Sequence, residues 1–240
     1  RGSKVRDSEV FDETMRDFGY TGSGVVIAIL DTGVDNEHFS LDDFSDDNND
    51  NEKEPDELAD PKWVGGCDAT SWSSQDCDDG SNDPDDGDGH GTHVAGIIAA
   101  NRENTIGING VAKNVTLVPV RVHSCSGLGN NSGVIAGLDW ILSPQNLNSK
   151  TQAVLNLSIG GGKSDALNDA IERLVNAGIT VVVAAGNEKA DACTKSPASA
   201  VNAITVGATD IGDAKASYTN FGTCVDINAP GSLITGGWYL

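Results

Sequence analysis

The sequence lacks any apolar run near the roughly 20 residues that a membrane-spanning helix requires, so a membrane is not an expected partner. No apolar stretch follows the first residues, Arg1-Gly2-Ser3-Lys4, and there is no initiator methionine. We therefore expect a processed or excised piece, without its own secretion signal. Aromatic residues make up only 5% of the chain, whereas its 29 glycines indicate many tight turns.

Basic residues are also scarce, because 15 Lys and Arg stand against 36 Asp and Glu. The imbalance is local: residues 31–88 contain 21 acidic residues and only 2 Lys. An acidic surface repels phosphates, so nucleic acid is not an expected partner. Residues 40–88 have almost no apolar periodicity, and we interpret them as a long inserted loop within a single domain covering residues 1–240. The loop is either a solvated acidic segment or a calcium-binding insertion.

The five cysteines do not follow a zinc-binding pattern, and they are too many for a typical cytosolic enzyme. At least one disulfide is the better interpretation, which indicates an oxidising compartment and a secreted protein. The odd number leaves one thiol without a partner within this chain.

Buried strands alternate with helical patterns along most of the chain. Continuous apolar runs predict strands covered on both faces, at residues 25–30, 117–122, 153–158, 180–185 and 203–207. Apolar residues at helical spacing predict helices at residues 93–100, 132–142 and 164–177, the last with Ser164 as N-cap and Gly178 at its end. This alternation predicts an α/β fold with a mostly parallel sheet, whose chemistry lies beyond the carboxyl ends of the strands.

Three short motifs place chemically useful side chains at such positions. Asp31-Thr-Gly follows the first predicted strand, and a carboxylate there is poorly solvated and needs a partner. His90-Gly-Thr-His-Val-Ala-Gly opens a helix. Asn187 ends the fourth strand after Ala184-Ala-Gly, where its amide can donate a hydrogen bond to a developing oxyanion.

These motifs, with Ser158-Ile-Gly-Gly between the last two, resemble those of the subtilase family in number and order. The resemblance runs from about residue 19 to 230. Within the family the chain is most similar to the proteinase K and aqualysin branch, because residues 187–193, 196–199, 220–227 and 229–231 fit that branch. The resemblance implies a subtilisin-like three-layer sandwich with a central, mostly parallel sheet, incomplete at the C-terminus.

The resemblance also implies roles in peptide hydrolysis by an Asp-His-Ser triad. His90 would be the general base, Asp31 would orient its imidazole, and Asn187 would stabilise the oxyanion. Two strips would pair with an extended peptide substrate, and a third would form walls of a roomy pocket for apolar side chains. The strips are Ser126, Gly127, Leu128 and Gly129, then Ser158, Ile159 and Gly160; the walls are Ala184, Ala185 and Gly186.

Other interpretations of these residues are open. Asn187 can be a turn former, and Asp31 or His90 can have a structural role. We expect His93 to be structural, and His38 and His123 to be ordinary loop or surface residues. An aspartic protease also carries Asp-Thr-Gly, but it needs two such aspartates, and this chain has one.

The serine segment of the family, of the Gly-Thr-Ser-Met-Ala type, is absent from the sequence. Gly222-Thr-Cys224 is the nearest match, but it falls where the branch has a disulfide cysteine. We therefore expect the chain as given to be inactive, as a gene fragment, an inactive homologue or one part of a split enzyme. The alternative to an endopeptidase is a pseudoprotease that binds peptides without cleaving them.

The resemblance further implies a Cys193–Cys224 disulfide and structural calcium, with no catalytic cofactor. The calcium would be held by Asp226 and by the carbonyls of Val201 and Ala203, although Asp226 can instead be a strand-end residue with backbone partners. Cys125 would pair with Cys77 or Cys67, unless Cys67 and Cys77 pair with each other. An N-terminal prodomain outside this chain, a monomeric state, and peptide or protein substrates complete the expectation.

Overall fold

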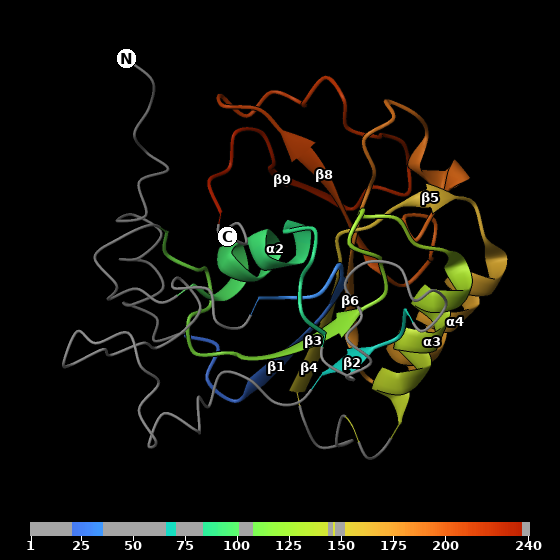
Figure 1. Cartoon of the computed structure of the whole chain (residues 1–240). Helices are drawn as coiled ribbons and strands as arrows, with labels where there is room; N and C mark the ends of the chain where they lie inside the picture. The colour runs from blue at the N-terminus through green and yellow to red at the C-terminus, as the bar shows by residue number, and fades with distance from the viewer. Residues whose placement is uncertain are drawn as a thin grey trace.

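The computed structural model describes residues 21–35, 66–70, 84–100, 108–143, 146 and 152–236. These residues form a central sheet with helices on both faces (Figure 1). The sheet has seven strands in the order β2-β3-β1-β4-β6-β8-β9, and all of its pairings are parallel. The chain is therefore an α/β protein with a parallel sheet, as its alternating pattern predicts.

All five predicted strands are present in this sheet within two residues of their expected ends. They are β1 (Val25–Asp31), β3 (Thr116–Arg121), β4 (Gln152–Leu157), β6 (Thr180–Ala184) and β8 (Ile204–Thr209). Leu30, Leu117 and Leu155 are completely buried. Their continuous apolar runs reflect strands that are covered on both faces.

The two edge strands were not expected from the sequence, since they are short and carry no apolar run. β2 (Cys67–Asp68) pairs with β3, and β9 (Ile227–Pro230) pairs with β8 and is exposed along its whole length. Part of the acidic range 40–88 therefore belongs to the sheet. A second, antiparallel sheet is made of β5 (Gly161–Gly162) and β7 (Lys195–Ser196), next to the 3₁₀ helix η3 (Ala192–Thr194).

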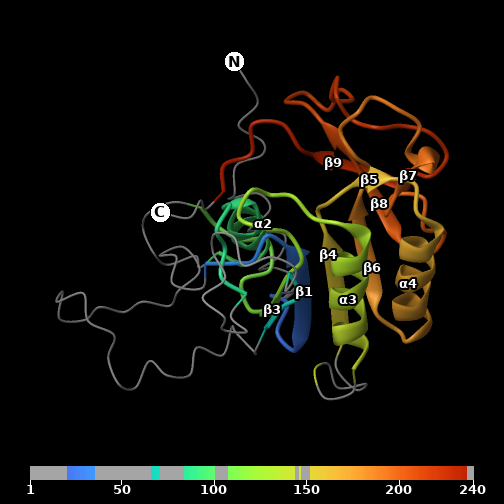
Figure 2. The ribbon, with the colours of Figure 1, turned by 45° about the vertical axis from the view of Figure 1, so that its right-hand side comes forward.

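Helices α3 (Asn131–Leu142) and α4 (Asp165–Asn176) lie side by side against the sheet (Figure 2). Each begins with a side chain that accepts a hydrogen bond from the helix: Asn130 from the N–H of Gly133, and Ser164 from that of Leu167. Ser164 is thus the N-cap that the sequence predicts. Gly178, at φ 90°, follows the end of α4, in a left-handed conformation that suits glycine.

Helix α2 (His90–Ala99) packs on the other side of β1 and begins three residues before its predicted start. Apolar spacing alone places the start at residue 93, because His90-Gly-Thr contains no apolar residue, whereas the motif that opens with His90 marks the observed start. The two faces of the sheet consequently have separate cores. Leu138, Ile171 and Val183 belong to the core on the α3 and α4 side, and Ile29, Ala95 and Leu117 to the smaller core under α2.

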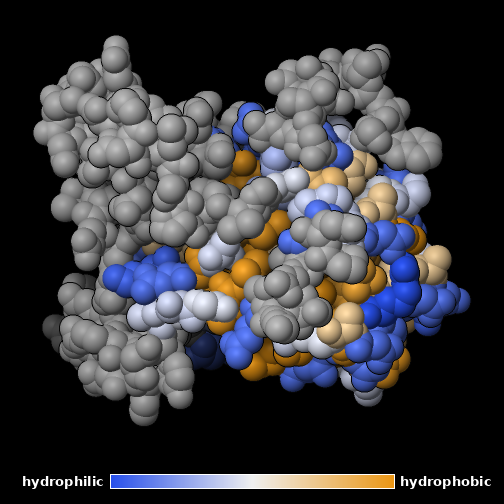
Figure 3. Space-filling view, turned by 90° about the horizontal axis from the view of Figure 1, so that it is seen from below, coloured by the Kyte–Doolittle hydropathy of each residue, from blue (hydrophilic) through white to orange (hydrophobic). Residues whose placement is uncertain are grey.

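The surface of the described residues is mixed. Seen from below, apolar residues gather near the middle of the face, and hydrophilic residues dominate its right-hand edge (Figure 3). Among these residues, no helix is both long enough and apolar enough to cross a bilayer.

Cys193 and Cys224 form a disulfide with a Cα–Cα distance of 5.3 Å. It joins η3, which follows the β6 loop, to the turn before β9, and it closes a loop of 31 residues. Replacing both cysteines by alanine should lower the free energy of unfolding by about 3–4 kcal/mol, because the unfolded chain regains the entropy of this loop. Urea denaturation of both proteins without reductant measures the loss. A loss below about 1 kcal/mol would contradict the loop-entropy account.

Candidate active site

The first two motifs, which begin with Asp31 and His90, are in contact in the structure. Asp31 is the last residue of β1 and is fully buried, and His90 is the first residue of α2. Asp31 Oδ1 lies 2.6 Å from His90 Nδ1 and also accepts the N–H of Thr32 at 2.8 Å. Asp31 Oδ2 is buried and has no hydrogen-bond partner among the residues that the structure describes. The carboxylate therefore depends on His90 and on the N–H of Thr32 for compensation.

The hydrogen bond that His90 donates to Asp31 raises the pKa of His90 above its ordinary value of 6.5. Partial burial of the ring opposes this rise, whereas the charges of Asp31, Asp88 and Asp86 add to it. The side chain of His90 is 46% exposed, although that of Asp31 is not exposed at all. The imidazole thus has one nitrogen bound to a buried carboxylate, while its other side faces outward.

Asn187 lies in an exposed loop directly after β6. The side chain of Asn220, a residue that is 1% exposed, holds this loop with four hydrogen bonds. Its carbonyl accepts the N–H groups of Glu188 and Ala190, and its amide donates to the carbonyl of Ala185 and to the carboxylate of Glu188. Asn220 falls in the range 220–227 that fits the branch, but its role was not predicted, because no local sequence signal shows which loop a buried side-chain amide will bind.

A cavity of about 560 Å³ brings several predicted residues together. His90 and Asn187 line it, together with Ser158 and the predicted pocket walls Ala184, Ala185 and Gly186. Val182, Val206 and Ala208 from β6 and β8 form an apolar part of the lining. An imidazole, a side-chain amide and an apolar surface thus share one hollow at the carboxyl ends of β4 and β6.

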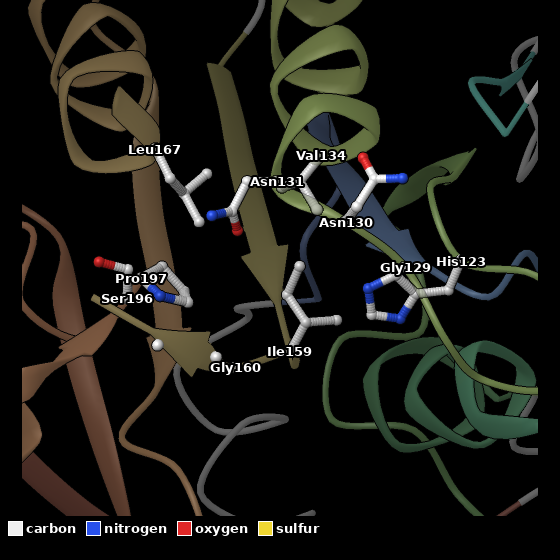
Figure 4. A pocket seen from close by; sticks show the side chains of 12 residues that line it. His123, Gly129, Asn130, Asn131, Val134, Ile159, Gly160, Leu167, Ser196 and Pro197 are labelled. Atoms are coloured by element: carbon white, nitrogen blue, oxygen red, sulfur yellow. The ribbon is translucent and has the colours of Figure 1, made fainter. Parts of the chain in front are cut away.

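A second cavity, of about 370 Å³, lies beside α3 and contains the other predicted strip residues Ile159, Gly160 and Gly129. Figure 4 shows Ile159 near its centre, the His123 ring on one side, and Leu167 with Pro197 on the other. Leu128 and Gly129 also line a smaller cavity of about 270 Å³. Ser126 and Gly127 line none of these three cavities.

His123 was expected to be an ordinary loop or surface residue; it does lie in a loop, but at a cavity. Its ring lines the second cavity and is partly buried. Burial lowers its pKa, and nearby His90 lowers it further, although Asp31 and Asp88 act in the opposite direction. No sequence motif marks this position, since its importance depends on the loop turning back at Gly129, with which His123 forms an isolated bridge. His38 lies outside the described residues.

The residues assigned to calcium lie where β8 and β9 begin. Asp226 Oδ2 accepts the N–H of Thr205 at 2.8 Å, and its own N–H donates to the Thr205 carbonyl. Ala203 immediately precedes β8, and Val201 is 87% exposed. A carboxylate and two carbonyls supply only oxygen, which is the donor that Ca²⁺ prefers, so the residues fit such an ion. Within the described ranges no three His, Cys, Asp or Glu side chains form a cluster that could hold a metal.

The state of Cys67 and Cys125 limits the possible disulfide pairings of the remaining three cysteines. Cys67 is a free, buried thiol, so neither pairing that involves it is formed. Burial, with a smaller contribution from Asp68, raises its pKa. Cys125 is disulfide-bonded, and its partner lies outside the described residues, as does Cys77.

Comparison with known proteins agrees with this geometry. The model of the subtilase family matches residues 22–238. The chain belongs to the subtilase family. It is 42% identical over 220 residues to the alkaline serine exoprotease A of Vibrio alginolyticus. This match covers 92% of this chain and 34% of the relative. It is 52% identical over 167 residues to the extracellular serine proteinase of Thermus sp. (strain Rt41A), covering 70% of this chain and 36% of the relative.

A crystal structure of a cold adapted subtilisin-like serine proteinase superposes with a TM-score of 0.72 at 40% identity. The match covers 91% of this subtilase chain and 67% of that protein. The subtilisin-like fold is therefore shown, and the relatives are named as serine proteases. The chain spans only about a third of the length of the two bacterial relatives.

Proposed function

We propose that this chain carries the general base, its orienting carboxylate and the substrate groove of a secreted serine endopeptidase. The supporting observation is the 2.6 Å contact between buried Asp31 and His90, at a cavity that Asn187 also lines. We further propose that the nucleophilic serine comes from a segment that this sequence does not contain, so the chain as given is inactive.

His90 performs the proton transfers in this mechanism. Because Nδ1 is bound to Asp31, the imidazole is held with its proton on that nitrogen, and Nε2 is left to take the proton of a serine hydroxyl. The same nitrogen then returns the proton to the leaving amine. Asp31 stays ionised and stabilises the imidazolium that forms between these steps.

Asn187 and the backbone strips bind the substrate. The Asn187 amide is exposed at the cavity that His90 lines, where it can donate to the oxyanion of a tetrahedral intermediate. The strips at residues 126–129 and 158–160 offer backbone groups to an extended peptide. The small residues Ala184, Ala185 and Gly186 leave room for large apolar substrate side chains.

A chimera tests the function directly. In it, residues 1–231 are followed by the corresponding C-terminal part of the Thermus proteinase. We expect the chimera to cleave a peptide substrate and to react with a fluorophosphonate, whereas residues 1–240 alone do neither. Labelling of a residue of the 240-residue chain would refute the proposal that it lacks the nucleophile.

Replacing Asn187 by alanine should lower the kcat of the chimera by about 10²–10³-fold, with little change in KM. The amide interacts with charge that develops only in the transition state, which is why substrate binding is spared. Asn202→Ala is the matched control, because Asn202 pairs with Glu172 and does not line the cavity. A raised KM at unchanged kcat would assign Asn187 to substrate binding instead.

A pseudoprotease that only binds peptides is the second candidate, favoured by the absence of a Gly-Thr-Ser segment from the sequence. A pseudoprotease would bind peptides in the same cavities, but peptide binding alone does not require a buried carboxylate paired with His90. The chimera separates the two: a folded chimera that binds substrate without cleaving it supports the pseudoprotease.

We also propose that Asp226 and the carbonyls of Val201 and Ala203 hold a structural calcium ion. Calcium at 100 times its Kd should then raise the free energy of unfolding by about 2.7 kcal/mol, and a chelator should remove this gain. Asp226→Asn should abolish the calcium response, while its amide oxygen can still accept from Thr205. Asp169→Asn, an equal charge change at an exposed position of α4, should not. An equal response in both variants would exclude this site.

Three further properties are proposed with the function. The chain is a single domain with an acidic insertion at residues 40–88, it acts as a monomer on peptide or protein substrates, and it is made with an N-terminal prodomain. Secretion is supported by the extracellular Thermus relative and by the Cys193–Cys224 disulfide.

A further inference from the structure

Asp86 is a buried carboxylate that the proposed reaction does not use directly. It is 4% exposed, and five donors converge on its two oxygens. Oδ1 accepts the hydroxyl of Thr32 at 2.8 Å and the N–H groups of Asp88 and Gly89 at 3.0 and 2.9 Å. Oδ2 accepts the N–H and the hydroxyl of Thr92 at 2.9 and 2.6 Å. An ionised carboxylate has acceptors only, so it can receive all five donors.

These bonds replace a cap that the helix carrying His90 lacks. The N-cap position of α2 is Gly89, in a left-handed conformation and without a side chain to accept a hydrogen bond. The first N–H groups of a helix have no partner within it. Asp86 receives the N–H of Thr92, and the hydroxyl of Thr32 receives that of Gly91 at 2.9 Å. A negative charge at this end also suits the helix dipole.

Thr32 links this cap to the end of β1. Its N–H binds Asp31 Oδ1, and its hydroxyl donates to Asp86 while accepting from Gly91. The two segments are in close contact, because a Cβ on Gly91 would overlap the carbonyl of Gly33. Asp86 is therefore connected to Asp31 through Thr32. It also holds the first turn of the helix that begins with His90.

We propose that Asp86 is a positioning residue, which fixes the approach of His90 to Asp31 by holding the start of α2 against the end of β1. The acidic stretch at residues 83–88, which resembles a calcium loop in composition, has this carboxylate turned inward onto protein donors. The catalytic meaning of the inference rests on the proposed function, but the contact can be measured in the chain itself.

The experiment compares variants of the 240-residue chain, with ¹⁵N-labelled histidine, by NMR: two tests, two controls, one for assignment and one reference. Asp86→Asn places an NH₂ group against N–H and hydroxyl donors, whichever way the amide is turned. Thr32→Val keeps the shape of Thr32 but removes the hydroxyl bridge, whereas Thr32→Ser retains it. Ser164→Ala removes the side-chain cap of α4 and so lowers stability far from the site. His90→Gln identifies the His90 signals.

We expect Asp86→Asn and Thr32→Val to move the titration midpoint of His90 toward the ordinary value of imidazole. Part of the Asp86→Asn shift comes from the lost charge of Asp86, which itself raises the pKa of His90, so Thr32→Val, which keeps that charge, tests the positioning. We also expect the low-field Nδ1–H resonance to weaken or disappear. Thr32→Ser and Ser164→Ala should keep both signals as in the wild type. In the chimera, Asp86→Asn should lower kcat on the order of 10²-fold, the effect of a misplacement of about 1 Å.

A folded Asp86→Asn or Thr32→Val protein with the wild-type His90 titration would overturn the inference. If Asp86→Asn does not fold, Thr32→Val decides, because it leaves the carboxylate in place. Asp31→Asn is the reference for the proposed function. If it leaves the His90 signals unchanged, the Asp31–His90 pair itself fails, and that result is distinct from failure of Asp86.

Discussion

Replacing His90 by alanine is expected to abolish nearly all turnover of the chimera, with a fall in kcat on the order of 10⁶-fold. Without the imidazole, no group at the cavity accepts the serine proton in the first step or returns it to the leaving amine. KM should change little, because substrate binding relies on the backbone strips. Steady-state hydrolysis of a peptide anilide, with active-site titration, measures both constants.

His93→Ala is the matched control for this result, since His93 lies on the same helix three residues after His90. It should keep kcat within about tenfold of the unmodified chimera, as expected for a residue outside the reacting atoms. Equal losses in the two variants would show that either histidine acts only by stabilising α2.

Asp31→Asn should lower kcat on the order of 10⁴-fold, because the amide favours the wrong imidazole tautomer and gives no charge to the imidazolium. It should also remove the largest cause of the raised pKa of His90. Activity requires neutral His90, so the acid limb of kcat/KM should move to lower pH. A pH–rate profile of both chimeras measures this shift.

The same substitution has a stability signature with a defined sign. The folded-state pKa of His90 is raised, so the pair stabilises the fold fully below the unfolded value of 6.5. This stabilisation disappears as the pH rises through the folded-state pKa. Asp31→Asn should therefore cost more stability at pH 5 than at pH 9, by urea denaturation. An equal cost at both pH values would contradict the pairing of a charged His90 with Asp31.

The sequence predicted those parts of the fold whose signal is local and repeated. β1 and β6 are continuous apolar runs, and α4 has both an N-cap and a terminal glycine, so their bounds were nearly correct. β2 and β9 have two and four residues and no apolar run, and only their neighbours β3 and β8 make them strands. Pairing across a sheet depends on residues far away in the sequence, so a short segment without an apolar run gives no local signal of it.

The site divides in the same way. Asp31, His90 and Asn187 were chosen from motifs and resemblance, and the first two are within hydrogen-bond distance although 59 positions separate them. Their roles stay predictions until the variants are measured. Asp86 and His123 were not recognised, because composition does not reveal which carboxylate of an acidic run turns inward, nor which loop histidine reaches a cavity.

The buried thiol of Cys67 gives this molecule an internal reporter of local opening. It sits on edge strand β2, only 7% exposed, and its raised pKa leaves little reactive thiolate. Alkylation at this position therefore requires a local opening that exposes the thiol, which packs in the core on the α3 and α4 side. The rate of modification by a neutral reagent consequently measures how often that side of the sheet opens in the native protein, without any introduced label.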